Sequence, residues 1–246
     1  AAIAAAKRGF DVELWEKSFR LGGTLWAAGL PTFKRDVLRL ITYMERQVLK
    51  LGVKVRLNTE ATAEAVAAGN FDKVILATGS KPLMPPIEGI QTAAPANDYL
   101  LGLKKPGKKV VVIGGGLVGC ETAAYMKEFA EEVTIVEMLE DILKTADHCL
   151  NNDQALRAML KERNIGVVAG AKVLKISPNS VSYTKDGKEH TIECDTVIVA
   201  AGFEPNNELE DALDKKVKDL TVIGDAENPR KIITAVHEGY HAIRVM

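Results

Sequence analysis

Three glycines and one acidic residue are the clearest candidates for a binding site in this chain. Gly114, Gly116 and Gly119 follow an apolar run with the spacing Gly-x-Gly-x-x-Gly, and Glu137 ends the next strand-like segment. In this pattern the first glycine permits a tight turn, the second lets the backbone approach a pyrophosphate, and the third lets helix and strand pack closely. The N–H groups at the helix start would hold the phosphate charge. The pattern predicts dinucleotide binding, with Glu137 bonding a ribose hydroxyl; the alternative is a plain glycine-rich turn and a solvated acid.

The residues around Glu137 also indicate which nucleotide is preferred. Glu140 and Asp141 lie close by in the sequence, and no arginine directly follows the strand. A 2′-phosphate would meet negative charge there, so NADH is favoured over NADPH. Glu121 lies just past the helix opening. It either approaches the nicotinamide side of the cofactor or is an ordinary first-turn acid that complements the helix dipole.

Residues near the two ends of the chain predict a second nucleotide-binding site. Glu16 ends a strand and is the counterpart of Glu137, and Gly22 and Gly23 would let backbone approach a second pyrophosphate. Asp225 follows Gly224 after an apolar strand and would bond a ribityl or ribose hydroxyl. The alternatives are a plain loop at Gly22–Gly23 and a helix-capping role for Asp225. His237 lies in the last helix, either near a flavin pyrimidine edge or simply on the surface.

The elements that position these residues alternate between strand and helix patterns. A helix end is expected over residues 1–6. A proline-rich linker is expected over 81–107, and a glycine-rich loop over 20–30. The other expected segments are strands at 10–16, 53–57, 71–77, 109–113, 132–137, 165–168, 172–176, 180–184, 189–194, 195–201 and 220–223, and helices at 37–51, 120–129, 152–163 and 233–246. The segments 74–79 and 197–202 resemble each other, which suggests two related nucleotide-binding domains.

Composition excludes several other classes of protein. Lys plus Arg number 32 and Asp plus Glu number 33, a net charge of −1, so no electrostatic footprint for nucleic acid or an anionic membrane is present. No apolar run approaches about 18 residues, which argues against a membrane span. Three cysteines without CxxC spacing argue against a disulfide framework or a structural zinc site. A reducing, cytoplasmic location is the simplest expectation.

The cysteines are weak candidates for chemistry. Cys120 stands at a helix start, where a dipole lowers a thiol pKa, but such a cysteine more often packs against the strand. Cys149 beside His148 makes a poor metal site, and Cys194 is expected to be buried and inert. No residue is assigned as catalytic or as a metal ligand.

At this point the order of motifs resembles a known family. The chain is similar to the C-terminal, pyridine-nucleotide-disulfide-oxidoreductase-like half of the multidomain NADH:flavin oxidoreductases, such as 2,4-dienoyl-CoA reductase, enoate reductases and trimethylamine dehydrogenase. The resemblance covers essentially the whole chain. The motifs that carry it are Trp15-Glu16-Lys17, Leu21-Gly22-Gly23, Leu30-Pro31, Ala77-Thr78-Gly79, Gly114 to Gly119, Gly202-x-x-Pro205-Asn206, Gly224-Asp225 and His237-Glu238-Gly239.

The resemblance implies an α/β fold with two Rossmann-like three-layer domains. An NAD domain, residues 106–216, is inserted in a discontinuous FAD domain, residues 1–105 and 217–246, whose first strand is absent from the chain; we expect residues upstream of Ala1 in the parent protein. The implied FAD contacts are Glu16, Gly22, Gly23, Thr78, Gly79, Gly224 and Asp225. The implied NADH contacts are Gly114, Gly116, Gly119 and Glu137, and the further cofactor-binding residues are Lys17, Thr24, Ala77, Gly115, Val118, Gly202 and His237.

The implied function is a reductase module that passes hydride from NADH to FAD. Electrons would continue to an N-terminal barrel domain of the same parent protein, which holds FMN and an iron–sulfur cluster. The alternatives are a structural domain that binds only ADP, and a stand-alone NADH oxidase or ferredoxin-type reductase. Disulfide reduction is disfavoured, because the first glycine loop and its helix lack the CxxxxC pair of disulfide reductases. The oligomeric state, a homo-oligomer included, and the final acceptor stay open.

Overall fold

The chain divides into two compact units. The computed structural model describes residues 1–144 and 150–245. Unit 1 comprises residues 1–29, 35–81 and 203–246, and unit 2 comprises residues 30–34 and 82–202. The chain therefore passes between the units four times. The division expected from the sequence, at 105/106 and 216/217, stays a prediction.

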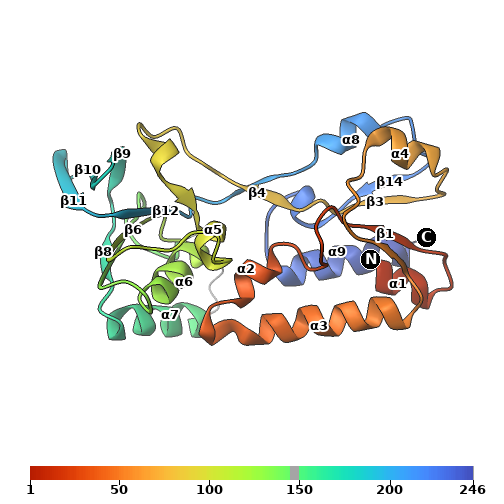
Figure 1. Cartoon of the computed structure of the whole chain (residues 1–246), viewed down its shortest axis with the longest axis horizontal. Coiled ribbons are helices and arrows are strands. Elements are labelled where there is room, and N and C mark those ends of the chain that lie inside the picture. The colour runs from red at the N-terminus through yellow and green to blue at the C-terminus, as the bar shows by residue number, and fades with distance from the viewer. Residues whose placement is uncertain (145–149, 246) are drawn as a thin grey trace. The chain divides into compact units, whose positions relative to one another are not determined.

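Unit 2 is built on a parallel sheet of five strands (Figure 1). Their order is β5 (Ala94–Pro95), β12 (Thr196–Val199), β6 (Lys109–Ile113), β7 (Glu132–Val136) and β8 (Gly166–Val168). The central strands β6 and β12 are continuous apolar runs and are buried along almost their whole length. Such runs are typical of parallel strands covered on both faces. The strand order reverses at β6, because β7 lies on one side of it and β12 on the other.

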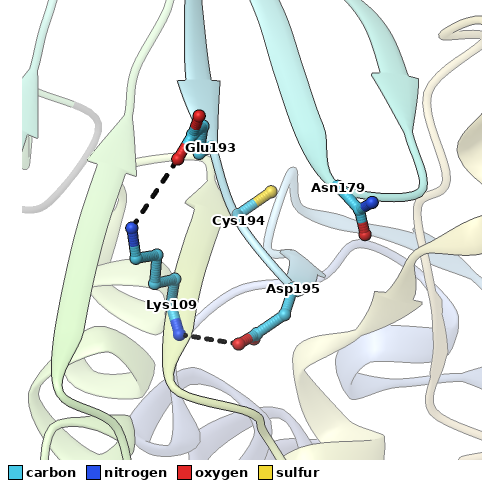
Figure 2. A pocket seen from close by; sticks show the side chains of 5 residues that line it. All are labelled: Lys109, Asn179, Glu193, Cys194 and Asp195. Atoms are coloured by element: carbon cyan, nitrogen blue, oxygen red, sulfur yellow. Dashed lines mark hydrogen bonds and ion pairs between the residues drawn. The ribbon is translucent and has the colours of Figure 1, made fainter.

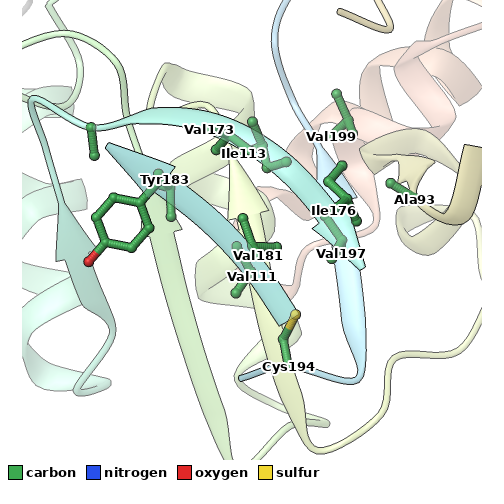
Figure 3. Packing of buried hydrophobic residues seen from close by; sticks show 12 residues of the cluster. Ala93, Val111, Ile113, Val173, Ile176, Val181, Tyr183, Cys194, Val197 and Val199 are labelled. Carbon is green, nitrogen blue, oxygen red and sulfur yellow. The ribbon is translucent and has the colours of Figure 1, made fainter. Parts of the chain in front are cut away.

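The faces of this sheet are covered by two different layers. Helices α5 (Ala96–Leu100), α6 (Leu117–Met126) and α7 (Leu150–Glu162) form one layer, in which α6 contacts β6, β7 and α7. The antiparallel strands β9 (Lys172–Ser177), β10 (Ser180–Lys185) and β11 (Lys188–Glu193) form the other. Figure 3 shows Val111 and Val197 of the parallel sheet packing against Val181 and Ile176 of β10 and β9. Because side chains alternate along a strand, Val110 and Val112 face the helices.

Unit 1 holds its strands as separate pairs, and two of these pairs are parallel. Strand β1 (Glu13–Trp15) pairs with β2 (Lys54–Arg56), and β3 (Val74–Leu76) pairs with β14 (Leu220–Val222). A third, short pair joins β4 (Ser80–Pro82) to β13 (Phe203–Pro205). The remaining elements of the chain are α1 (Ala2–Lys7), α2 (Leu25–Gly29), α3 (Arg35–Lys50), α4 (Ala63–Ala68), α8 (Glu208–Leu213), α9 (Ile232–Arg244) and the 3-10 turns η1 (Thr32–Lys34), η2 (Ile90–Thr92) and η3 (Gly224–Ala226).

Helix packing supports these strand pairs. Helix α1 contacts both α3 and α9, and α3 presents Ile41 and Val48 to the interior. Gly52 follows α3 with φ of +73°, a left-handed conformation that ends a helix without steric cost. Helices α4 and α8 bury Val66 and Leu213 against each other.

The structure differs from the sequence-based expectations in the loops. Residues 81–107 were expected to form a linker, but they contain α5 and the edge strand β5, which pairs with β12 through Ala94 and Pro95. A proline is tolerated there because an edge strand has one side that needs no N–H donor. The expected loop at 20–30 contains helix α2, and helices α4 and α8 were not anticipated. The predicted α/β class with a parallel sheet is confirmed.

Candidate functional site

The glycine turn of unit 2 lies at the carboxyl end of β6. Gly114 has φ of +105°, and a Cβ atom there would overlap the carbonyl oxygen of Ala200, which follows β12. A Cβ atom at Gly119 would overlap the carbonyl oxygen of Gly114. Gly116 is the N-cap residue of α6, and its backbone is extended. The turn therefore has no room for side chains, and it lies where the strand order reverses, the place where open α/β sheets bind ligands.

Glu137 is fixed against this turn. Its side chain follows β7 and is 9% exposed. One carboxylate oxygen accepts the N–H of Gly115 at 2.5 Å, and the other accepts the N–H of Leu139 at 2.7 Å. Each carboxylate oxygen can accept a second hydrogen bond, so both remain able to bond a ribose hydroxyl. The structure brings Glu137 and the glycine turn together, and Val118 lies half-buried in the first turn of α6 beside them.

Glu121 has a partner that the sequence did not indicate. Its carboxylate pairs with the ammonium of Lys34 at 2.6 Å, and the two side chains are only 18% and 25% exposed. Thr32, from the same short segment, donates to Glu128 at 2.7 Å. Segment 30–34 is thus bound to α6 by polar contacts, and Glu121 is not a free first-turn acid. The spacing of 87 residues hid this pair from local patterns.

In unit 1, Gly224 and Asp225 form a polar cluster at the end of β14. The N–H of Gly224, which has φ of +65°, donates to Glu238 at 2.7 Å. Asp225 accepts the N–H of Arg230 at 3.1 Å and the hydroxyl of Ser80 at 3.3 Å. Arg230 also pairs with Glu238. Ser80, Arg230 and Glu238 were not selected from the sequence, although Glu238 belongs to the motif quoted there.

The segment after β3 is tied to the segment after β13. The Thr78 hydroxyl donates to the carbonyl of Asn206, and the Asn206 amide donates to the carbonyl of Thr78 at 3.2 Å. The N–H of Asn206 also donates to the carbonyl of Gly79 at 2.9 Å. Ala77 and Thr78 are exposed, and a Cβ atom at Gly79 would meet no atom within 4 Å. This backbone is open to a ligand.

Other predicted contacts of unit 1 lie in the loop after β1. Glu16 accepts the N–H of Ser18 at 2.7 Å. Gly22 has φ of +109°, and a Cβ atom there would lie 2.9 Å from the indole nitrogen of Trp26, which donates to the carbonyl of Leu21. Gly23 has φ of +47° and open space around it. In this loop the exposed members of the predicted set are Lys17, Gly23 and Thr24, and elsewhere Ala77, Thr78, Gly202 and His237 are exposed as well.

His237 and Gly202 make few contacts of their own. The ring of His237 lies 6.4 Å from that of His241, one turn along α9. Gly202 follows β12 in unit 2 with φ of +109°, and its carbonyl accepts the N–H of Leu83 at 2.9 Å. The structure places His237 on the surface of unit 1, and its role stays a prediction.

The described cysteines are packing residues. Cys120 is completely buried in α6, and burial raises the pKa of its thiol to about 12. This decides against the reactive interpretation, because desolvation opposes the thiolate more strongly than any nearby positive charge favours it. Burial also raises the pKa of Cys194 to about 11. His148 and Cys149 lie outside the described residues.

A small cavity of about 320 Å³ lies at the amino ends of β6 and β12, whereas the glycine turn follows the carboxyl end of β6. Figure 2 shows Lys109, Glu193, Cys194, Asp195 and Asn179 around it. Asp195 accepts the N–H groups of Lys108 and Lys109 at 2.8 and 3.1 Å, and Lys109 pairs with Glu193 at 3.8 Å. The charged side chains that line this cavity therefore already have partners within the protein. None of the lining residues belongs to the predicted site.

Among residues 1–144 and 150–245, no group of three or more His, Cys, Asp or Glu side chains is arranged to hold a metal ion. Within the same residues, no helix is both long enough and apolar enough to cross a bilayer.

Known proteins resemble this chain over its whole length. It is 37% identical over 245 residues to cinnamate reductase of Clostridium sporogenes and 42% identical over 248 residues to NADH oxidase of Thermoanaerobacter brockii. These alignments cover 99% and 98% of this chain but only 37% and 38% of the relatives. A solved structure of a 2-naphthoyl-CoA reductase complex superposes with a TM-score of 0.93 at 35% identity, covering 98% of this chain and 37% of that one. The chain thus spans less than two fifths of these relatives.

The family pattern agrees with the geometry of both units. The pyridine nucleotide-disulphide oxidoreductase family matches residues 1–239, nearly the whole chain. The family match and the named reductase and oxidase relatives support FAD and NADH as the cofactors. The chain therefore belongs to the pyridine nucleotide-disulphide oxidoreductases.

Proposed function

We propose that this chain is the reductase module of an NADH:flavin oxidoreductase. Unit 2 binds NADH, and unit 1 contributes to the FAD site through the loops after β1, β3 and β14. The flavin supplies the chemistry by accepting a hydride, and the protein binds and orients the two cofactors. Electrons then pass to an FMN and iron–sulfur barrel domain that lies N-terminal to this module in the parent protein. This onward route is the resemblance-based part of the proposal.

The observation that carries the proposal is the side-chain-free turn at Gly114 and Gly119. A pyrophosphate needs close access to backbone N–H groups at a helix start, and this turn excludes even a Cβ atom. Glu137 is held beside the turn by two backbone N–H groups, with lone pairs left for a ribose. Both requirements of the dinucleotide pattern are therefore met in one place.

Unit 1 fits the adenine and ribityl parts of a flavin nucleotide. Gly22, Gly23, Gly79 and Gly224 all have positive φ, so backbone is presented without side chains on three loops. Asp225 is held by Ser80 and the Arg230 N–H, which orients its carboxylate as a hydroxyl acceptor. These residues bind and orient; none is needed to move a proton.

The relatives support different roles for this segment and for the rest of their chains. Cinnamate reductase and 2-naphthoyl-CoA reductase are named for different acceptors and NADH oxidase for its donor, yet all three share this segment. We therefore assign to the segment the step such enzymes have in common, oxidation of the nicotinamide nucleotide. The choice of acceptor belongs to the remaining three fifths of their chains.

An anaerobic NADH titration of the FAD-loaded protein tests this function. We expect stoichiometric bleaching of the flavin absorption band by NADH. Glu137→Gln should weaken NADH binding about tenfold while leaving the flavin content unchanged, because one charged acceptor is lost. Asp225→Ala should instead lower the flavin content.

Two outcomes would contradict the proposal. A protein that stays colourless after FAD loading and binds only adenine nucleotides would be a structural ADP-binding domain. A flavoprotein whose flavin NADH does not reduce would place the reductive step elsewhere. The matched control is Glu131→Gln, because Glu131 is an exposed acid of unit 2 that pairs with Lys108 and is not a member of the predicted site.

A further inference from the structure

An arginine that is distant in sequence reaches the loop after Glu137. Arg157 of α7 donates to both carboxylate oxygens of Asp141, at 3.1 and 2.9 Å. Its Nε donates to Asp153 at 2.7 Å, and one terminal nitrogen also donates to the carbonyl of Ile142 at 2.8 Å. Four donor interactions are thus made by a side chain with five N–H groups.

The loop held by Arg157 is docked on the glycine turn. Ile142 and Leu143 are buried, and the N–H of Leu143 donates to the carbonyl of Gly115 at 2.8 Å. Gly115 in turn donates to Glu137. A continuous set of bonds therefore runs from Arg157 through residues 141–143 to the turn and to the ribose-binding acid.

The charges around this loop are paired in a specific way. Lys144 pairs with Glu140 at 2.9 Å, and Arg157 pairs with Asp141 and Asp153. Among the described residues, Glu137 bonds the backbone N–H groups of Gly115 and Leu139. Counting these six side chains, two cations face four carboxylates, and both cations are engaged.

We propose that the Asp141–Arg157–Asp153 cluster determines the nucleotide specificity of this site. The two carboxylates occupy the guanidinium and keep it from serving as a 2′-phosphate ligand, so the site takes a nicotinamide nucleotide with a free ribose 2′-hydroxyl. The inference rests on the proposed NADH site in unit 2. It adds residues from α7 that the local sequence around Glu137 does not reveal.

The physical reason lies in the donor geometry of arginine. A guanidinium binds a phosphate through two parallel N–H donors, the arrangement now used by Asp141. A 2′-phosphate would have to displace a bidentate carboxylate while approaching Glu137, Glu140 and Asp153. Neutralising the two aspartates releases the guanidinium from its bidentate carboxylate and removes two of the negative charges, while Glu137 and Glu140 stay in place.

The test measures dissociation constants for ADP-ribose and 2′-phospho-ADP-ribose by calorimetry. These probes carry only the adenosine and pyrophosphate part of the nucleotide, so flavin reduction does not enter. The wild-type protein should prefer ADP-ribose. In Asp141→Asn/Asp153→Asn, binding of 2′-phospho-ADP-ribose should tighten about tenfold, the gain expected from one freed charged donor pair, with ADP-ribose affinity changed little.

A third substitution identifies the freed arginine as the cause. Adding Arg157→Met to the double variant should abolish the gain, whereas a general change in local charge would preserve it. Adding Arg157→Lys should retain part of the gain, because the charge remains but the fork is lost. Asp72→Asn is the matched control, since Asp72 makes an exposed ion pair with Lys218 in unit 1 and should leave both affinities unchanged.

The outcomes separate this inference from the proposed function. If the wild-type protein binds neither probe, the NADH site itself is wrong. If it binds ADP-ribose but the ratio of the two constants is the same in wild type and double variant, the cluster does not set specificity and the NADH site stands. Retention of the gain after Arg157→Met overturns the role of Arg157.

Discussion

At the scale of single residues, the backbone of the unit 2 turn is more informative than its side chains. Gly114 needs glycine for two separate reasons, a left-handed φ and contact with Ala200. Gly170, in the same unit, also has a left-handed φ, of +66°, but no atom lies within 4 Å of its Cβ position. An alanine at Gly170 would meet only the free-energy cost of a left-handed backbone. An alanine at Gly114 would meet that cost and also the overlap of its Cβ atom with Ala200.

This difference gives a stability prediction. Gly170→Ala should cost about 1 kcal/mol, the price of left-handed backbone in an L-residue. Gly114→Ala should cost about 2 kcal/mol more, because the added methyl group overlaps the Ala200 carbonyl and the turn must shift. Urea unfolding curves measure both values. Equal losses would show that the turn relaxes freely, which would weaken its interpretation as a close-fitting pyrophosphate cradle.

The buried thiols give a pH prediction. Burial raises the pKa of Cys120 to about 12 and of Cys194 to about 11, from an ordinary value of 9.0. The folded state thus favours the neutral thiol, and this contribution to stability is complete below pH 9 and is lost as pH rises toward 11–12. In a Cys149→Ser background, both thiols should react with a maleimide at pH 8 at least about a hundredfold more slowly than in urea. Rapid labelling of native Cys120 would contradict its assignment as a packing residue.

At the scale of elements, segment 30–34 has a role that its sequence conceals. Thr32 and Lys34 bond Glu128 and Glu121 of the α6 region, and Phe33 lies under Arg163, 5.7 Å from ring centroid to guanidinium carbon. Pro31 is completely buried. This short segment is therefore an integral part of unit 2, although the residues that precede and follow it in the sequence belong to unit 1.

A double-mutant cycle tests the contact between this segment and α6. Lys34→Met and Glu121→Gln, alone and together, should give a coupling free energy of about 1 kcal/mol that decreases with added salt. The Lys34–Glu121 pair exceeds a typical surface pair because it is three-quarters buried. The exposed pair Lys218–Asp72 should give a coupling close to zero in the same measurement. Similar couplings for both pairs would show that segment 30–34 is only loosely held.

Local patterns predicted the long elements well and the short ones poorly. Strand β6, a continuous apolar run between charges and glycines, was predicted with its observed ends. Strand β5 and helix α5 were hidden in a proline-rich stretch, because an edge strand of two residues has no periodicity and is stabilised only by β12. Local patterns likewise predict only those residues of the candidate site that follow a fixed sequence spacing. Gly114, Gly119 and Glu137 follow a spacing rule, whereas Lys34 and Arg157 reach it only through tertiary packing.

At the scale of the whole chain, two compact units with separate cores suggest two separate unfolding events. Calorimetry should resolve two transitions. ADP-ribose at about one hundred times its dissociation constant should stabilise unit 2 by about 2.7 kcal/mol and raise only one transition temperature. A single transition that shifts as a whole would show that the units unfold together. Glu137→Gln should reduce the shift at the same ligand concentration.

The discontinuity of unit 1 has a consequence for the order in which the chain folds during synthesis. Strand β3 ends at Leu76, but its partner β14 lies far downstream, as the 146-residue separation of Lys73 from Asp219 shows. At about 5–20 residues per second, a ribosome needs roughly 7–30 s to make that stretch. Residues 82–202, which make up nearly all of unit 2, emerge in this interval and can pack their core. Strand β3 must therefore stay without its partner β14 until the neighbouring unit is complete.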